Sequence, residues 1–167
     1  LVVGFVGLQD EAFAALLNVG LEPTPVSRPH PPIWTGGNSR RALRRAVDRA
    51  DGWIPMPAPK AFARFVRSSP LESLADLRAG LEYAHRRGAE VGRTVPLDVM
   101  FGPMNVGRYG DPRFDAPAYI EQAGHLSELG VNYAGVSFSM PGSGSMQSGA
   151  RFLELAAGFM REVASKV

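Results

Sequence analysis

The sequence has 167 residues, of which 45% are hydrophobic and 20% are charged, and it contains no cysteine. This composition is typical of one globular domain and excludes disulfide bonds and cysteine-ligated metal, and the three histidines lack the spacing of a metal site. The net charge of +2 is too small to predict a nucleic-acid partner, and the lack of cysteine fits a cytoplasmic protein.

The N-terminal segment predicts a strand, a helix and a long loop. An apolar run over 1–7, LVVGFVG, is typical of a short buried strand, and the spacing over 10–17 is helical. The run lacks a basic leader and meets acidic residues too soon for a signal peptide or a membrane span, so no membrane partner is expected. Five prolines within 22–32 predict an extended loop.

A second strand and a basic helix are predicted next. Residues 33–35 form a short apolar run that ends at the glycine pair 36–37, and Asn38 or Ser39 can cap the helix that follows. Apolar residues recur on one face of this helix. The other face carries five arginines: Arg40, Arg41, Arg44, Arg45 and Arg49. We interpret this face as a solvated surface.

The remainder of the chain repeats the alternation of strand and helix. The predicted elements are a strand over 53–56, a helical turn over 61–66, a helix that begins at Ser69 and Pro70 and is stopped by Gly88 and Gly92, a strand over 95–101, a helix over 117–129, a strand over 131–138 and a helix over 149–167. Asp115 and Gly130 are expected to cap the helix between them.

This alternation predicts an α/β fold in which helices cover parallel strands. A doubly wound sheet and a (β/α) barrel both satisfy it. The long polar loops, over 36–39, 102–115 and 139–148, all follow strands and favour the barrel, whose sites lie on that side. A complete barrel needs about 250 residues, so we expect one domain over 1–167 that forms an incomplete (β/α)8 barrel.

The turn after Trp34 is the candidate binding site. The start of a helix presents unpaired N–H groups and the positive end of the helix dipole, and glycine lets a phosphate approach the backbone. Side chains of the turn, and Arg40 or Arg41 behind it, can add donors. The candidate residues are Thr35, Gly36, Gly37, Asn38 and Ser39. A turn that serves only folding has the same composition, so the local pattern leaves both interpretations open.

A family resemblance favours the phosphate. The stretch VGLEPTPVSRPHPPIWTGGNSRRALRRAVDRADGWIPM resembles the segment that leads into strand five of the luciferase-like monooxygenase superfamily, in particular its deazaflavin-dependent oxidoreductases. The run LVVGFVGLQDEAFAALL is similar to the family's strand four and the loop behind it, and YIEQAGHLSELGVNYAGVSF to its last helix and strand. The resemblance implies a (β/α)8 barrel, commonly dimeric, that binds its cofactor at the carboxyl ends of the strands.

The resemblance also implies a function. It places residues 35–39 beside the phosphate or ribityl chain of the cofactor and Gly7 closer to its ring. The expected activity is transfer of a hydride between coenzyme F420 and a small organic substrate. Two alternatives stay open: a monooxygenase that depends on flavin mononucleotide (FMN), and a non-catalytic barrel relative that binds a cofactor or only dimerises.

The sequence departs from the family pattern in two places. The helix and small hairpin that the family has before the proline-rich loop are absent near 17–19, and the family's strands one to three are absent before Leu1. We expect segments to be missing at both places. The catalytic residues, which the family carries on those strands, are therefore not assigned.

Other polar residues are weaker candidates. We interpret Asp98 as a strand-end aspartate bonded to a loop rather than a functional carboxylate, and His85 and His125 as surface or packing residues. The loop over 102–115 can cover a substrate, and the Gly/Ser-rich segment 140–146 can close over a phosphate.

Overall fold

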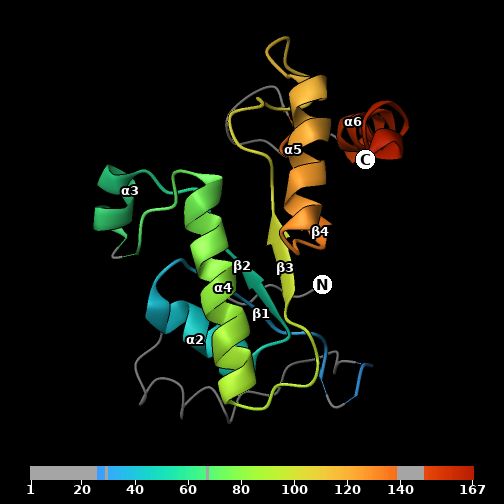
Figure 1. Cartoon of the computed structure of the whole chain (residues 1–167). Helices are drawn as coiled ribbons and strands as arrows, with labels where there is room; N and C mark the ends of the chain where they lie inside the picture. Colours follow the sequence, from blue (N-terminus) through green and yellow to red (C-terminus); the bar gives the residue numbers. More distant parts are fainter. Residues whose placement is uncertain (1–25, 29, 67, 139–148) are drawn as a thin grey trace. The chain divides into compact units, whose positions relative to one another are not determined.

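The structure, a computed structural model, describes residues 26–28, 30–66, 68–138 and 149–167 (Figure 1). The chain divides into two compact units, the first unit over 1–97 and the second unit over 98–167. The described residues form five α-helices and four strands, and the strands pair in parallel within each unit. A mixed α/β fold with parallel strands is therefore confirmed, whereas a closed barrel is not seen in the described part of the chain. The elements predicted over 1–7, 10–17 and 139–148 lie outside the described residues.

The first unit begins with a strand–helix–strand repeat. Strand β1 (Trp34–Gly36) pairs in parallel with β2 (Gly52–Ile54), and helix α2 (Arg40–Arg49) connects them. The strand, the basic helix and the second strand lie where the sequence predicts them, with shifts of one or two residues at their ends. The apolar stripe of α2 is buried through Leu43, Ala46 and Val47, which turns its arginines outward.

Two buried tryptophans lie in the core of the first unit, and each packs against a position that is glycine. Trp34 and Trp53 are 5% and 1% exposed. A Cβ on Gly52 would lie 2.7 Å from the Trp34 ring, and one on Gly80 would lie 2.8 Å from the Trp53 ring. Each indole therefore occupies the space that a side chain at the facing position would need.

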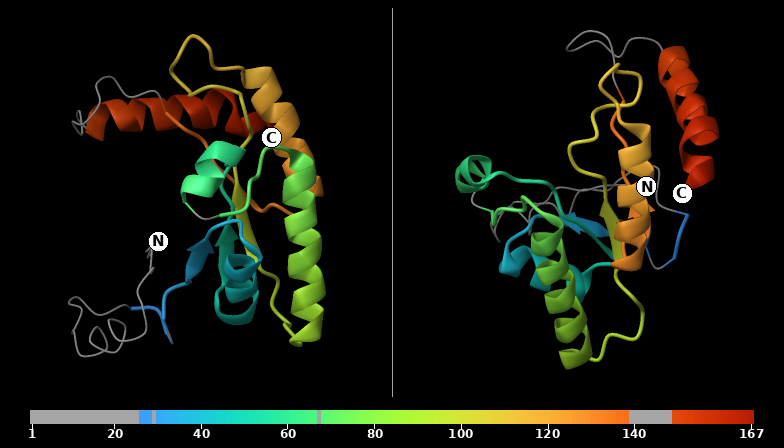
Figure 2. Two further views of the ribbon diagram at one scale, coloured as in Figure 1. Left: turned by 90° about the vertical axis from the view of Figure 1, so that its left-hand side faces the viewer. Right: turned by 45° about the horizontal axis from the view of Figure 1, so that its top comes forward.

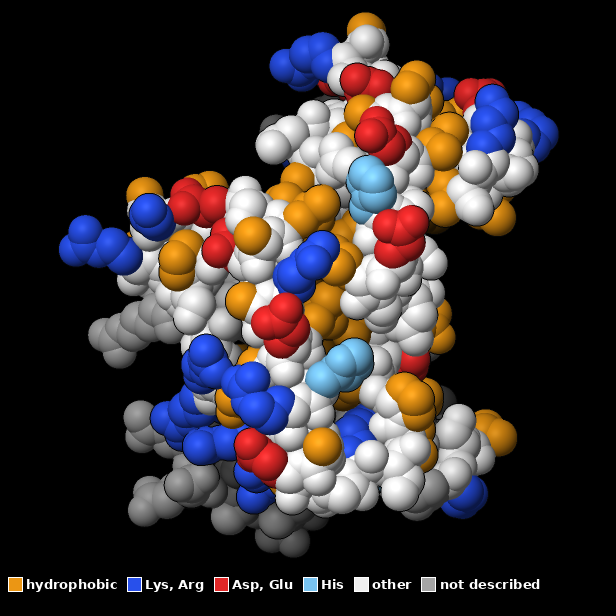
Figure 3. All heavy atoms as spheres, in the orientation of Figure 1, with side chains coloured by type: hydrophobic (Ala, Val, Ile, Leu, Met, Phe, Trp, Pro, Cys, Tyr) orange, Lys and Arg blue, Asp and Glu red, His pale blue; other side chains and the backbone are white. Residues whose placement is uncertain are grey.

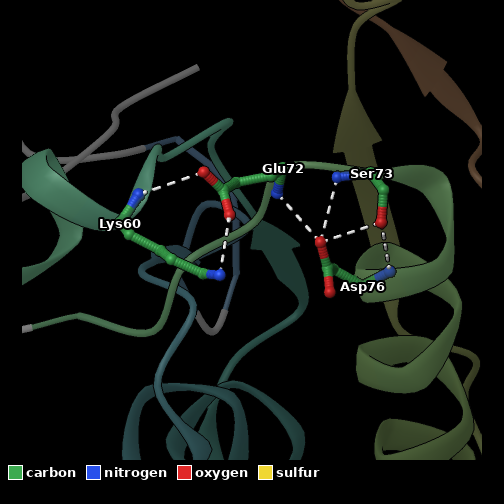
Figure 4. A network of polar contacts seen from close by, with 4 residues as sticks. All are labelled: Lys60, Glu72, Ser73 and Asp76. Carbon is green, nitrogen blue, oxygen red and sulfur yellow. Dashed lines mark hydrogen bonds and ion pairs between the residues drawn. The ribbon is translucent and has the colours of Figure 1, made fainter.

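Helix α4 (Leu74–Glu90) begins four residues later than the sequence predicts. Ser73 caps it, because the Ser73 hydroxyl accepts the N–H of Asp76 at 3.2 Å and the Asp76 carboxylate accepts the N–H of Ser73 at 3.0 Å (Figure 4). This reciprocal capping box overrides the start predicted at Ser69 and Pro70, which was wrong. The helix also continues through Gly88, and Gly92, with φ of +67°, follows its end.

A glutamate beside this capping box, Glu72, binds the first residue of the neighbouring short helix. Glu72 accepts the N–H of Lys60, the first residue of α3 (Lys60–Phe65), at 3.2 Å, and its other carboxylate oxygen lies 4.0 Å from the Lys60 ammonium (Figure 4). The starts of α3 and α4 are thus connected through consecutive residues of one loop.

Arginines connect α4 to α2, which lie side by side (Figure 2). The Arg87 guanidinium binds both carboxylate oxygens of Asp48, at 2.9 and 3.0 Å. Arg93 donates to the carbonyl groups of Val47 and Ala50, both at 2.9 Å, and so satisfies acceptors at the end of α2. The bidentate Arg87 also lowers the pKa of the Asp48 carboxyl.

The second unit repeats the strand–helix–strand order. Strand β3 (Asp98–Phe101) leads through a long loop into α5 (Ala116–Glu128), and β4 (Tyr133–Ala134) pairs in parallel with β3. Helix α6 (Gly149–Glu162) and a 3₁₀ turn at Ala164–Lys166 close the chain. Both strands are shorter than the predicted runs 95–101 and 131–138: β3 takes only the last four residues of the first run, and β4 only two residues near the start of the second. No helix in the described part of the chain is long and apolar enough to cross a membrane.

An aromatic cluster forms the core of the second unit. Tyr119 of α5 and Phe159 of α6 meet edge to face with ring centroids 5.2 Å apart, and both are buried. Tyr109, Phe114 and Phe138 pack around them. Asp115 caps α5 by accepting the N–H of Ala118 at 3.0 Å, and Gly130 follows α5 with φ of +92°, so both predicted caps are confirmed.

Candidate functional site

The turn between β1 and α2 places Gly37 in a conformation that favours glycine. Its φ is +102°, and a Cβ on it would approach the Cβ of Ala42 to 3.1 Å. The Gly37 carbonyl accepts the indole N–H of Trp53 at 2.9 Å. The buried tryptophan of β2 therefore fixes the turn that follows β1.

Asn38 uses its whole side-chain amide to join three segments of the first unit. Its Nδ2 donates to the carbonyls of Met56 at 2.8 Å and Ser69 at 3.2 Å, while its Oδ1 accepts the N–H of Met56 at 3.0 Å. Its own N–H donates to the Ser68 hydroxyl at 3.1 Å. Asn38 thus ties the turn to the segment after β2 and to the loop before α4, and these contacts occupy the donors expected to face a ligand.

Of the two predicted caps, Asn38 and Ser39, the structure has Ser39 as the cap of helix α2, and part of the helix start is left unbonded. Its hydroxyl accepts the N–H of Ala42 at 3.2 Å, and its carbonyl accepts the N–H of Leu43 at 2.9 Å. The backbone N–H groups of Arg40 and Arg41 have no acceptor among the described residues. The groups that remain for an anion are therefore backbone amides of the first turn, at the positive end of the helix dipole.

Thr35 differs from the other residues of the turn. Its hydroxyl oxygen is buried and has no hydrogen-bond partner among the described residues. A buried hydroxyl without a hydrogen-bond partner costs free energy. The Thr35 hydroxyl therefore either binds a ligand or stays without a polar contact. Gly36, next to it, pairs with Ile54 of β2 and ends the strand. Gly7 and the segment 140–146 lie outside the described residues.

The loop over 102–115 is held from two sides within the second unit. Gln122 of α5 binds both backbone groups of Met104, at 2.9 and 3.2 Å. The Tyr109 hydroxyl donates to Glu162 of α6 at 2.7 Å, and burial together with this carboxylate raises the pKa of Tyr109. These contacts anchor the loop to its own helices.

The remaining candidates take structural positions. Asp98 accepts the side-chain N–H of Asn132 at 2.7 Å, and Asn132 in turn accepts the N–H of Val99 at 2.7 Å, so the prediction of a strand-end aspartate bonded to a loop is confirmed. His85 and His125 lie on the exposed faces of α4 and α5. Among the described residues no group of three or more potential metal ligands comes together.

Met56, Ser68 and Ser69 complete the turn through their hydrogen bonds to Asn38, and none of the three was predicted as part of it. They lie 18 to 31 positions from Asn38 along the chain, and no local pattern relates them to it. No model of a known protein family matches the chain.

Proposed function

We propose that the chain belongs to an oxidoreductase of the luciferase-like type, which transfers a hydride between coenzyme F420 and a small organic substrate as a homodimer. In this proposal the strand–helix units belong to a (β/α)8 barrel. The cofactor supplies the hydride chemistry when bound, and the protein positions it. The turn over 36–41 holds the phosphate of the cofactor.

The supporting observation is the pair of backbone N–H groups at Arg40 and Arg41. They follow a parallel strand and a glycine pair, which is the position at which α/β proteins bind ligands. An anion at this position would accept hydrogen bonds from two backbone N–H groups that have no acceptor among the described residues. The arginine side chains add positive charge. In this proposal the absence of a Cβ at Gly36 keeps the approach to these amides open.

A second candidate function is supported by Asn38. Because its side-chain amide is bonded to Met56 and Ser69, the turn has a structural purpose that needs no ligand. This favours a non-catalytic relative, in which the glycines only allow the chain to turn.

The proposal is tested by titrating the protein with F420 and with FMN, following cofactor fluorescence. We expect F420 to bind. Gly36→Val should weaken that binding, because the new side chain hinders the approach of the phosphate to the backbone N–H groups. Gly124→Val is the matched control, since a Cβ at that exposed position meets nothing within 4 Å. Binding of FMN alone would support the monooxygenase. Absence of binding and of turnover with either cofactor would support the non-catalytic relative.

A further inference from the structure

Helix α6 has a second apolar face in addition to the one that packs in the second unit. Its packed face is buried through Leu155 and Phe159. On another side of the helix, Leu153 and Met160 are 66% and 63% exposed, and Ala157 between them is exposed as well. Figure 3 shows hydrophobic and charged side chains together at the surface over α6. Packing within the unit needs only the buried face, so it does not account for the exposed one.

The exposed apolar residues have the spacing of a helix-pairing surface. Leu153, Ala157 and Met160 follow one another at intervals of four and three residues, and we call them the α6 seam. This spacing keeps apolar side chains on one side of a helix, where a second helix can pack against them. The small Ala157 between two large residues leaves room for a large side chain of a facing helix.

Two charged residues flank the α6 seam on one side. Glu154 and Arg161 each come directly after a seam residue, and they lie seven positions apart, which is close to two helical turns. Both are exposed. Glu154 forms a surface ion pair with Arg151 at 3.1 Å, and its side chain stays 67% exposed. The flank therefore carries a negative charge near one end and a positive charge near the other.

A second copy of α6 that runs in the opposite direction complements both the seam and the charges. In a two-fold arrangement, Ala157 of each copy can face Met160 of the other, so that a small side chain meets a large one. The same register places Glu154 of each copy beside Arg161 of the other, because these positions flank the facing pair. In a parallel pair each position faces its own copy, and this pairing of opposite charges is lost.

We propose that the exposed face of α6 is the interface of a homodimer in which the two copies of α6 pack antiparallel. The α6 seam supplies the apolar contact, and the two Glu154–Arg161 pairs set the direction and register. The proposal goes beyond the proposed function, since neither the seam nor its charges involve the turn after β1 or a cofactor. A seam of two helical turns is smaller than the interface of a tight dimer, so we expect dissociation at roughly micromolar concentrations.

Charge reversal tests the pairing directly, with sedimentation velocity over a range of protein concentrations as the measure of the dimer Kd. Glu154→Arg and Arg161→Glu each turn two attractive contacts of the dimer into repulsive ones, and each should weaken dimerisation about tenfold or more. The double variant E154R/R161E exchanges the charges and should restore the dimer. An equal mixture of the two single variants should form a mixed dimer. Glu128→Arg, on the exposed face of α5, is the matched control and should leave the Kd unchanged.

Introduced thiols give a second measurement, because the chain contains no cysteine of its own. In E154C/R161C the two thiols of one chain are about 10 Å apart along the helix, which is too far for a disulfide. The thiols of two antiparallel copies lie side by side. Mild oxidation should therefore give a covalent dimer on a denaturing gel for the double variant and little for E154C alone.

The outcomes separate this interface from the proposed function. A dimer that survives both single charge reversals overturns the α6 interface and leaves a homodimer through another face. An unmodified protein that is monomeric at every concentration overturns the interface too. In that case, charge variants that unfold at lower urea concentration would show that another segment of the chain covers the seam. Circular dichroism checks folding, and if the charge variants do not fold, the presence or absence of the covalent dimer decides. Cofactor titration tests the proposed function independently.

Discussion

The connection after β1 and the connection after β3 both lead from a parallel strand into a helix, but different forces hold them. The first has three residues, 37–39, and is held by hydrogen bonds of Asn38 and Ser39 to backbone groups. The second has fourteen residues, 102–115, and is held largely by the packing of Tyr109 and Phe114 in the aromatic cluster.

The difference follows from length and has a consequence for binding. Three residues cannot bury apolar surface of their own, so the short connection depends on polar contacts and leaves amides unbonded at the start of α2. The long connection carries aromatic side chains into the core, and both of its ends are bonded to α5, through Gln122 and through the Asp115 cap. The short connection is therefore the better candidate for a ligand, and the long one for stability.

The largest effect is expected in the aromatic cluster. Phe159→Ala should lower the free energy of unfolding by about 3–5 kcal/mol, because it removes a ring that is 7% exposed and leaves a cavity. Urea denaturation measures this. Phe65→Ala is the control, since the Phe65 side chain is 85% exposed and should cost little. Similar costs for the two variants would contradict the role given to the cluster.

A smaller effect is expected where polar contacts hold the turn. Asn38→Asp keeps the acceptor for Met56 but replaces the donor to two carbonyls with negative charge, so the free energy of unfolding should fall by about 2 kcal/mol. Asn105→Asp makes the same change at an exposed position that has no such contacts and serves as the control. If both variants unfold at the same urea concentration, Asn38 does not hold the turn.

The start of α4 should respond more weakly again. Ser73→Ala removes the hydroxyl that accepts the N–H of Asp76, and we expect a loss of about 1 kcal/mol in thermal or urea unfolding. Ser127→Ala, in the exposed face of α5, should be neutral or slightly stabilising because alanine favours helix. A neutral Ser73→Ala would show that the capping box contributes nothing in solution.

The same capping box should give a dependence on pH. Hydrogen bonds from the N–H of Glu72 and from Ser73 hold the pKa of the Asp76 carboxyl below its ordinary value of 3.8. A carboxyl with a lowered folded pKa stabilises the fold above the unfolded pKa, and this contribution is lost as the pH falls through the folded pKa. The stability difference between the unmodified protein and Asp76→Asn should therefore shrink below about pH 4. A difference that is constant from pH 6 to pH 2 would contradict this.

The smallest effect, with the opposite sign, is expected at Thr35. Thr35→Val removes a buried hydroxyl that has no partner among the described residues, so stability should be unchanged or rise by up to about 1 kcal/mol. Urea denaturation measures this, and Thr94→Val, at an exposed position between elements, is the control. A marked loss of stability at Thr35 alone would mean that the hydroxyl has a partner within the protein.

Local patterns in the sequence predicted much of the fold. The apolar stripe of α2 and the Asp115 and Gly130 caps of α5 depend on residues within one or two helical turns, and all were confirmed. The pattern left Asn38 and Ser39 as alternative caps of α2, and the structure has Ser39 there. The start of α4 was wrong because Ser69 and Ser73 each precede an acidic residue by three positions, Glu72 and Asp76, so the local pattern does not choose between them. In the structure Glu72 binds the N–H of Lys60, and Ser73 forms the capping box with Asp76. The strands over 95–101 and 131–138 were too long because pairing, which apolar runs do not encode, sets strand ends.

The sequence by itself determined the alternation of strands and helices, the outward arginines of α2 and the glycine turn after β1, because each follows from side-chain spacing or backbone freedom within a few residues. Only the tertiary structure decided that Asn38 is bonded to Met56 and Ser69, that the Thr35 hydroxyl is buried and that Gly52 and Gly80 make room for indole rings. These features depend on partners far apart along the chain, which come together only when the apolar surfaces of the first unit pack.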